Sequence, residues 1–364
     1  MFIVSALLAG AFGYALWTRY HAFADAPIAG IAPGQVLVVE AGDSFPRALR
    51  KLRAAGARGG HDLEWQALAR QLRTANRLQV GEYVLTKGMT PRRLLEEMRD
   101  GSVLRHRFTI VEGWNIRELR AGLARQRDLR QVVAGLDDAA LMGAMGATGQ
   151  HPEGRFLPET YHFTRGDSDL DVLKRAHAAM QKALQKAWAD RAPELPLKSA
   201  DEALVLASIV EKETGIASER PQIAGLFVRR LQKGMLLQTD PTVIYGLGSS
   251  YDGNLRKRDL LADTPYNTYS RAGLPPTPIA MPGVDALRAA TRPASGDAVY
   301  FVATGDGSGR HVFSRTLAEH QVAVRAYVQR YREQHRTQPP ASIPVPAPVP
   351  TPTPAPALTV PPAR

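Results

Sequence analysis

The sequence predicts an α+β fold with four parts: an N-terminal apolar helix, a small α+β module, a larger α+β domain and a proline-rich tail. Three observations lead to this prediction. The chain has 364 residues, which is longer than one ordinary domain. Residues 2–18 carry no charge, and prolines recur at almost every second position near the C-terminus. Hydrophobic residues make up 44% of the chain and charged residues 22%, so most of it can bury a core.

The apolar segment at the N-terminus is long enough for a marginal membrane span. As a helix, residues 2–18 would reach about 26 Å at about 1.5 Å per residue, close to the hydrocarbon thickness of a bilayer. We therefore predict a transmembrane anchor over residues 1–20. A cleaved signal peptide is the alternative, because Ala22, Phe23 and Ala24 resemble a processing site. Both interpretations place the rest of the chain outside the cytoplasm.

The composition limits the kinds of partner and cofactor. A formal net charge of +11 favours acidic partners such as anionic lipids, nucleic acid or an anionic cell-wall polymer. No dense basic block with interleaved aromatic residues occurs, so we do not expect nucleic-acid binding. The chain has no cysteine, and its nine histidines form no zinc-binding helix motif. We therefore predict neither a metal site nor a cofactor.

Residues 36–107 are predicted to form the small α+β module. The pattern indicates a strand at 36–39, helices at 44–55 and 62–75, a strand at 80–85 and a helix at 91–100. The last helix has clear boundaries, because Thr90 can cap it, Pro91 suits its first turn and Gly101 follows its end.

Residues 108–334 are predicted to form the larger domain. A strand at 108–111 precedes a helix that begins near Asn115, and amphipathic helices are expected at 169–189, 221–233 and 316–332. Residues 299–302 and 311–313 flank a glycine-rich loop that we interpret as a hairpin turn. A phosphate-binding loop is excluded because strand-like residues, not a helix, follow the glycines. Residues 337–364 are predicted to be an extended, disordered proline-rich tail.

The segment 199–215 is predicted to be a helix that ends in two glutamates. Ser199 and Glu202 have the spacing of a capping box, and Gly215 marks the end. At 100° per residue, Glu211 and Glu213 point to different faces. Glu213 shares its face with Leu206 and is predicted to be the more sheltered of the two. Shelter and the negative end of the helix dipole would both raise the pKa of Glu213, as a general acid requires. An ordinary surface glutamate is the alternative.

Residues 234–246, 265–269 and 273–279 are predicted to be loops stiffened by proline and rich in tyrosine, asparagine, glutamine and threonine. Such loops can stack on sugar rings and hydrogen-bond their hydroxyl groups with little loss of conformational entropy. The alternative is that they only connect secondary-structure elements.

Several long motifs in order give a specific resemblance over residues 36–332. The motifs are ASIVEKETG, LQTDPTVIYG, YNTY, GLPPTPI, VYFVA and FLPETY. Together they resemble the YceG-like family of endolytic murein transglycosylases. The resemblance implies a single-span protein of the inner membrane, with a LysM-like module at 36–107 and a periplasmic catalytic domain at 108–334. It also implies that the second glutamate of the EKET motif, Glu213, is the catalytic acid and base.

The resemblance implies cleavage of the bond between N-acetylmuramic acid and N-acetylglucosamine in nascent glycan strands, which would end chain growth and leave a 1,6-anhydro muramyl end. The muramyl C6 hydroxyl would act as nucleophile, so one glutamate would suffice. The expected partners are glycan strands, the inner membrane and peptidoglycan synthases. The candidate substrate-binding residues are Gln238, Asp240, Tyr245, Tyr266 and Asn267.

Two other functions remain open from the sequence. One is hydrolysis by two carboxylates, with Asp240 or Glu219 as the partner of Glu213. The other is a non-catalytic, wall-binding scaffold for the elongation machinery. Because Glu211 would lie off the catalytic face, we expect Glu211→Gln to keep most activity.

Overall fold

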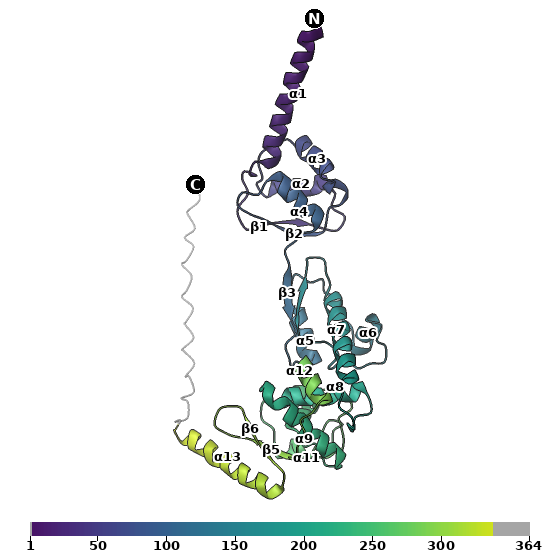
Figure 1. The fold of residues 1–364 in the computed structure, drawn as a ribbon, viewed down its shortest axis with the longest axis vertical. Helices are drawn as coiled ribbons and strands as arrows, with labels where there is room; N and C mark the ends of the chain where they lie inside the picture. The colour runs from purple at the N-terminus through teal and green to yellow at the C-terminus, as the bar shows by residue number, and fades with distance from the viewer. Residues whose placement is uncertain (1, 338–364) are drawn as a thin grey trace, which may run out of the picture. The chain divides into compact units, whose positions relative to one another are not determined.

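A computed structural model describes residues 2–337, which divide by their internal contacts into a unit ending at Val299 and a unit beginning at Tyr300. Figure 1 shows the elements along the chain. The helices are α1 (Phe2–Asp25), α2 (Phe45–Ala54), α3 (Asp62–Gln71), α4 (Pro91–Asp100), α5 (Ile116–Ala124), α6 (Asp138–Ala144), α7 (Asp169–Ala189), α8 (Ala200–Glu213), α9 (Arg220–Gln232), α10 (Asp240–Leu247), α11 (Lys257–Leu261), α12 (Val284–Thr291) and α13 (Leu317–Thr337). The strands are β1 (Gln35–Val39), β2 (Gly81–Leu85), β3 (His106–Thr109), β4 (Thr160–Phe163), β5 (Tyr300–Ala303) and β6 (His311–Ser314).

The N-terminal apolar segment is helical, as α1. Its second half is fastened to the small module, because Arg19 pairs with Glu64 at 3.0 Å and Asp25 pairs with Arg92 at 2.7 Å. The residues 1–20 were predicted to be a transmembrane anchor. Within residues 2–337, however, no helix combines the length and the apolar character that crossing a membrane requires.

The small module has a core of its own. Strands β1 and β2 pair antiparallel, with Leu37 opposite Tyr83, and helices α2, α3 and α4 pack against them (Figure 1). Trp65 and Tyr83 are fully buried at the centre. Burial of such side chains is worth about 1.5–3 kcal/mol each, which is enough to hold a module of this size together. The predicted order of strand, two helices, strand and helix is confirmed.

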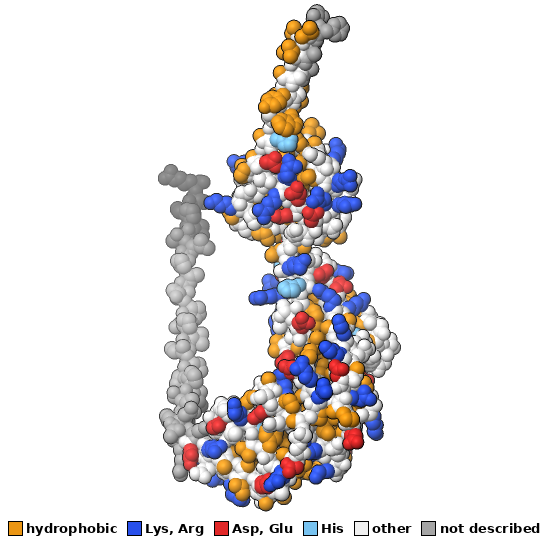
Figure 2. All heavy atoms as spheres, in the orientation of Figure 1, with side chains coloured by type: hydrophobic (Ala, Val, Ile, Leu, Met, Phe, Trp, Pro, Cys, Tyr) orange, Lys and Arg blue, Asp and Glu red, His pale blue; other side chains and the backbone are white. Residues whose placement is uncertain are grey.

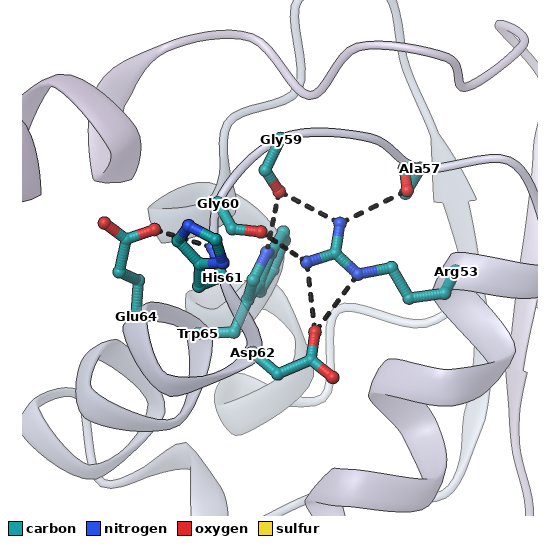
Figure 3. A network of polar contacts seen from close by, with 8 residues as sticks. All are labelled: Arg53, Ala57, Gly59, Gly60, His61, Asp62, Glu64 and Trp65. Carbon is teal, nitrogen blue, oxygen red and sulfur yellow. Dashed lines mark hydrogen bonds and ion pairs between the residues drawn. The ribbon is translucent and has the colours of Figure 1, made fainter.

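A polar network fixes the turn between α2 and α3 (Figure 3). The guanidinium of Arg53 donates to the carbonyl oxygens of Gly59 at 2.9 Å and Gly60 at 2.6 Å, and it pairs with Asp62 at 3.1 Å. The indole of Trp65 donates to the Gly59 carbonyl as well. Gly59 and Gly60 have positive φ, and their carbonyl oxygens have no backbone donor among the described residues. Arg53 supplies the hydrogen bonds that these carbonyls need.

Residues 106–299 contain a second core and the helices that carry the candidate site. Strands β3 and β4 pair antiparallel and cover Phe156, Leu119 and Val172, among others. Helix α8 packs against α12, α9 and α7 (Figure 1). It is buried at every position from Ala203 to Val210, so it is a central helix rather than a surface one.

Two local predictions for this region need correction, and two elements were not predicted. Residues 240–247, predicted to be loop, form α10, because Pro241 suits the first turn of a helix. The elements that were not predicted are β4, which begins at Thr160 near the end of the FLPETY segment, and α12, which lies in the region 279–299. The capping box at α8 is only half formed. Ser199 accepts from the Glu202 amide, but the Glu202 carboxylate accepts from the amide of Lys198 instead of that of Ser199.

The second unit begins with the predicted hairpin, in which β5 and β6 pair antiparallel with Phe301 opposite Phe313. Helix α13 packs against both strands. Residues 300–334 were predicted to belong to one domain with 108–299, whereas their contacts make them part of a compact unit that begins at Tyr300. The predicted proline-rich tail lies outside the described residues from position 338 onward.

Candidate active site

Helix α8 ends at the two glutamates of the EKET motif. Thr214 has extended backbone angles and stops the helix, and its hydroxyl accepts a hydrogen bond from the amide of Ile216 at 3.0 Å. The chain then turns through residues 214–219 into α9. The abrupt end exposes Lys212 but leaves Glu211 and Glu213 facing two different surroundings.

Glu211 lies in a closed electrostatic cluster. Its side chain is 5% exposed, it pairs with Arg220 at 3.0 Å, and it accepts the amide of Gly283 at 3.0 Å. Arg220 also pairs with Glu112 at 3.2 Å. Burial raises the pKa of Glu211, and the Gly283 amide and the Arg220 guanidinium offset only part of that effect. Since both oxygens of Glu211 are used to join α8, α9 and α12, we assign this residue a structural role.

Glu213 lies on the other side of α8 and is half-buried. One of its carboxylate oxygens accepts a hydrogen bond from the hydroxyl of Thr239, which is buried. The phenol of Tyr269 is close enough that the charge of Glu213 contributes to the raised pKa of that tyrosine. Both glutamates are half-buried, so the expectation that Glu213 is the more sheltered of the two stays a prediction. Helix α8 is apolar on all sides, so its hydrophobic pattern does not show which face is exposed.

Three threonines hold the segment that faces Glu213. The amide of Thr239 donates to the hydroxyl of Thr268 at 3.1 Å, and the hydroxyl of Thr242 donates to the Thr239 carbonyl at 2.7 Å. The hydroxyls of Thr242 and Thr268 lie 2.9 Å apart. All three are buried, so the hydroxyl of Thr239 is aimed at Glu213 by a rigid, fully bonded support.

Gln238 and Asp240 flank Thr239 on the exposed side. Gln238 has φ of +49°, a left-handed conformation that costs a residue other than glycine about 1 kcal/mol or more. Asp240 is the first residue of α10 and accepts a hydrogen bond from the phenol of Tyr269. Burial and this bond raise the pKa of Tyr269, so its phenol stays protonated. The structure thus brings two of the predicted substrate-binding residues next to Glu213, and adds Thr239 and Tyr269.

Tyr245 and Tyr266 belong to a neighbouring network. Their rings meet edge to face at 4.8 Å, and the Tyr266 phenol lies 2.8 Å from the hydroxyl of Thr277. The phenol of Tyr245 donates to Glu153 at 3.0 Å. Glu153 is completely buried and also accepts the amide of Ile116. Burial raises the pKa of Glu153 to about 7, and these hydrogen bonds offset only part of that effect.

The side chain of Asn267, a predicted substrate-binding residue, is occupied within its own loop. Its side chain is fully buried and donates to the carbonyls of Leu260 at 3.0 Å and Ala262 at 2.6 Å. Its oxygen accepts the amide of Tyr269 at 2.9 Å. With these groups occupied, Asn267 stiffens the loop that presents Tyr269.

Sequence reasoning missed three residues of this region. Thr239 and Tyr269 both lie within motifs that were quoted, but only their contact across the fold marks them. Glu153 carries no local signal, because a glutamate before a glycine is common in turns. Across residues 2–337, no group of three or more histidine and acidic side chains could hold a metal ion.

The model of the YceG-like family matches residues 37–326. The chain belongs to the YceG-like family. It is similar to the endolytic murein transglycosylase of Bacillus subtilis, with 32% identity over 70% of this chain and 74% of that protein. It is also similar to the endolytic murein transglycosylase of Streptococcus pneumoniae, with 27% identity over 62% of this chain and 46% of that protein.

Among solved structures, this YceG-like chain is similar to a YceG-like protein from Listeria monocytogenes. The TM-score is 0.52 and the sequence identity 28%, over 79% of this chain and 98% of that one. The mixed α+β fold predicted from the sequence is therefore that of the YceG-like family.

Proposed function

We propose that this YceG-like chain is a lytic murein transglycosylase that cleaves within glycan strands, with Glu213 as its acid and base. The observation that supports this most is the position of Glu213. It is half-buried at the end of a rigid helix, accepts a hydrogen bond from Thr239, and faces the exposed groups of Gln238 and Asp240. The names of the relatives in Bacillus subtilis and Streptococcus pneumoniae supply the substrate class.

The reaction needs one group that gives and then takes a proton. Protonated Glu213 donates its proton to the glycosidic oxygen, the bond from that oxygen to the muramyl C1 breaks, and positive charge develops on the sugar ring. The Glu213 carboxylate then removes the proton from the muramyl C6 hydroxyl. The C6 oxygen bonds to C1 and gives a 1,6-anhydro end. Proton and charge balance without water, and without the second carboxylate that most glycoside hydrolases use.

The neighbours of Glu213 fit this cycle. The hydroxyl of Thr239 fixes the direction of the carboxylate and donates to it whenever it is ionised. Tyr269 keeps its proton and can share it between Asp240 and a bound sugar oxygen. The carboxylate of Asp240, which is exposed, would stabilise the positive charge that develops on the ring.

The place of the reaction follows from its substrate. Peptidoglycan lies outside the cytoplasmic membrane, so the catalytic part would work on the periplasmic side, close to the synthases that make the strand. Cleavage within a nascent strand would end its growth and set its length.

The products of the reaction test the proposal. Purified protein is incubated with uncross-linked glycan strands, and the released ends are analysed by mass spectrometry. We expect 1,6-anhydro muramyl ends from the wild type and none above background from Glu213→Gln. Reducing ends, heavier by one water, would instead indicate hydrolysis with Asp240 or Glu219 as second carboxylate. Equal product from wild type and Glu213→Gln would support a non-catalytic scaffold.

A further inference from the structure

A groove between α7 and α12 lies outside the candidate active site. It encloses about 400 Å³. Its floor consists of small apolar side chains, chiefly Ala179, Ala183 and Ala187 of α7. Its rim carries charged side chains: Lys182, Lys186, Asp190, Arg288 and Arg292. Figure 2 shows apolar side chains bordered by basic ones over the part of the molecule where these helices lie.

Helical spacing explains how the groove is built. Residues 179, 183 and 187 of α7 recur every fourth position and form one apolar stripe, with Lys182 and Lys186 beside it. On α12, Val284, Arg288 and Arg292 follow the same spacing. Each helix therefore presents a pair of like charges one turn apart, an arrangement that destabilises a helix by a few tenths of a kcal/mol.

Three of the four basic side chains of the rim form no ion pair within the described residues. Arg288 pairs with Asp285 at 3.4 Å, but no ion pair joins Lys182, Lys186 or Arg292 to a carboxylate of the described residues. The helix dipole favours basic residues in the last turn, where Lys186 and Arg288 lie, but Lys182 precedes that turn. Lys182, Lys186 and Arg292 are exposed, so their charges are accessible to a ligand of opposite sign.

The groove begins at the same end of α8 as the catalytic glutamate. Gly283, directly before α12, donates its amide to Glu211, two residues from Glu213. Val284, the first residue of α12, follows Gly283 directly and lines the groove.

We propose that the α7–α12 groove binds the short, acidic, alanine-rich peptide that branches from muramic acid in the strand. This rests on the proposed function. Alanine methyl groups match the small side chains of the floor, and the peptide carboxylates match Lys182, Lys186 and Arg292. Asp190 on the same rim matches the amino group of the diamino acid in that peptide. A lipid phosphate would gain nothing from Asp190, so the mixed rim favours the peptide over a membrane surface.

Binding of the free peptide is the first test, because it does not depend on catalysis. The probe is a synthetic tetrapeptide of alanine, γ-linked glutamate, a diamino acid and alanine, titrated into the full chain by calorimetry. We expect the double variant Lys182→Glu with Lys186→Glu to weaken binding by about tenfold, since two exposed ion pairs become repulsive. Lys174→Glu, on the same helix but outside the groove, is the matched control and should bind like the wild type.

Cleavage is the second test and separates this proposal from the proposed function. The same variants are given strands with peptides and strands from which an amidase has removed the peptides. We expect the double variant to lose rate only on the strands with peptides. No tetrapeptide binding by the wild type, or equal binding by the double variant, would overturn the peptide site. Weaker attachment to phosphatidylglycerol vesicles with unchanged tetrapeptide binding would overturn it in favour of a membrane contact. Absence of cleavage of both strands by the wild type would contradict the proposed function alone.

Discussion

The last turn of α8 carries two glutamates that differ by two positions and have opposite surroundings. On the Glu211 side, Arg220 and the amide of Gly283 occupy the carboxylate and close the space around it. On the Glu213 side, the carboxylate accepts from Thr239 and the segments around it carry exposed polar groups. The Glu211 side, the closed side, joins three helices, and the Glu213 side, the open side, carries the exposed residues Gln238 and Asp240.

Under the proposed function, burial alone does not mark the catalytic carboxyl group. Glu211 and Glu153 are the deeply buried acids of this region, and burial raises the pKa of both. Both use their oxygens to hold backbone amides and side chains in place. The groups beside Glu213 lie on segments fixed by other residues. Catalysis requires an acid that the substrate can reach and that a rigid surrounding structure holds in place.

The open side should control the reaction and not the fold. We expect Glu213→Gln to lower the rate of strand cleavage by about 100- to 10,000-fold, the range for loss of a general acid and base. The melting temperature and the affinity for uncleaved strands should stay near those of the wild type. Calorimetry and strand binding measure both. A large loss of stability would mean that Glu213 also supports the fold.

The closed side should control the fold. Replacing Glu211 with glutamine removes the buried carboxylate of the three that face Arg220 and leaves the exposed ones of Glu112 and Asp285, so we expect unfolding to become easier by about 3 kcal/mol. Asp285→Asn is the control, because Asp285 is exposed and lies 3.9 Å from Arg220. Urea unfolding of both variants gives the comparison. The expectation from sequence that Glu211→Gln is nearly silent then holds only for activity at temperatures where the variant is folded.

Glu153 should make stability depend on pH. Its pKa is raised to about 7 in the folded chain from the ordinary value of 4.5, so folding favours the protonated form. Stability should therefore fall as pH rises from about 4.5 to 7 and change little above that range. Each pKa unit corresponds to about 1.4 kcal/mol, so the loss is on the order of 3 kcal/mol. Glu153→Gln should remove this dependence in unfolding curves at several pH values, and parallel curves would contradict the assignment.

Substitution of Thr239 should have the smallest effect, and it should change activity without changing stability. Thr239→Val removes the hydroxyl that donates to Glu213 while keeping the shape of the side chain, so we expect kcat to fall by about tenfold with unchanged stability. Thr239→Ser keeps the hydroxyl and should restore most of the rate. If serine and valine behave alike, the hydrogen bond does not position the acid.

Local signals predicted most of the fold. Caps and breakers such as Thr90 with Gly101 fixed helix ends within a few residues, and the glycine-rich turn at 305–309 predicted the β5–β6 hairpin. Residues 240–247 were missed as a helix, although Asp240 and Pro241 are themselves a helix start. The glycines and prolines in and around residues 240–247 favoured the prediction of a loop.

The site could be predicted only in part, for a physical reason. The EKET motif pointed to Glu213, but the helix that carries it is buried on all sides. The hydrophobic pattern of such a helix does not show which of its two glutamates is the more exposed. Thr239 and Tyr269 join Glu213 through contacts between residues far apart in sequence, which periodicity does not contain. The side chain of Asn267 has the chemistry to bind a sugar, and only its burial shows that it binds the backbone instead.

A side-by-side comparison of Glu211→Gln and Glu213→Gln tests the division between the two glutamates most directly. Both variants and the wild type are assayed for release of 1,6-anhydro ends at a temperature where each is fully folded. We predict that Glu211→Gln releases ends within a few-fold of the wild type while melting at a lower temperature, and that Glu213→Gln melts normally and releases none. Normal release by Glu213→Gln, or its absence from folded Glu211→Gln, would contradict this account.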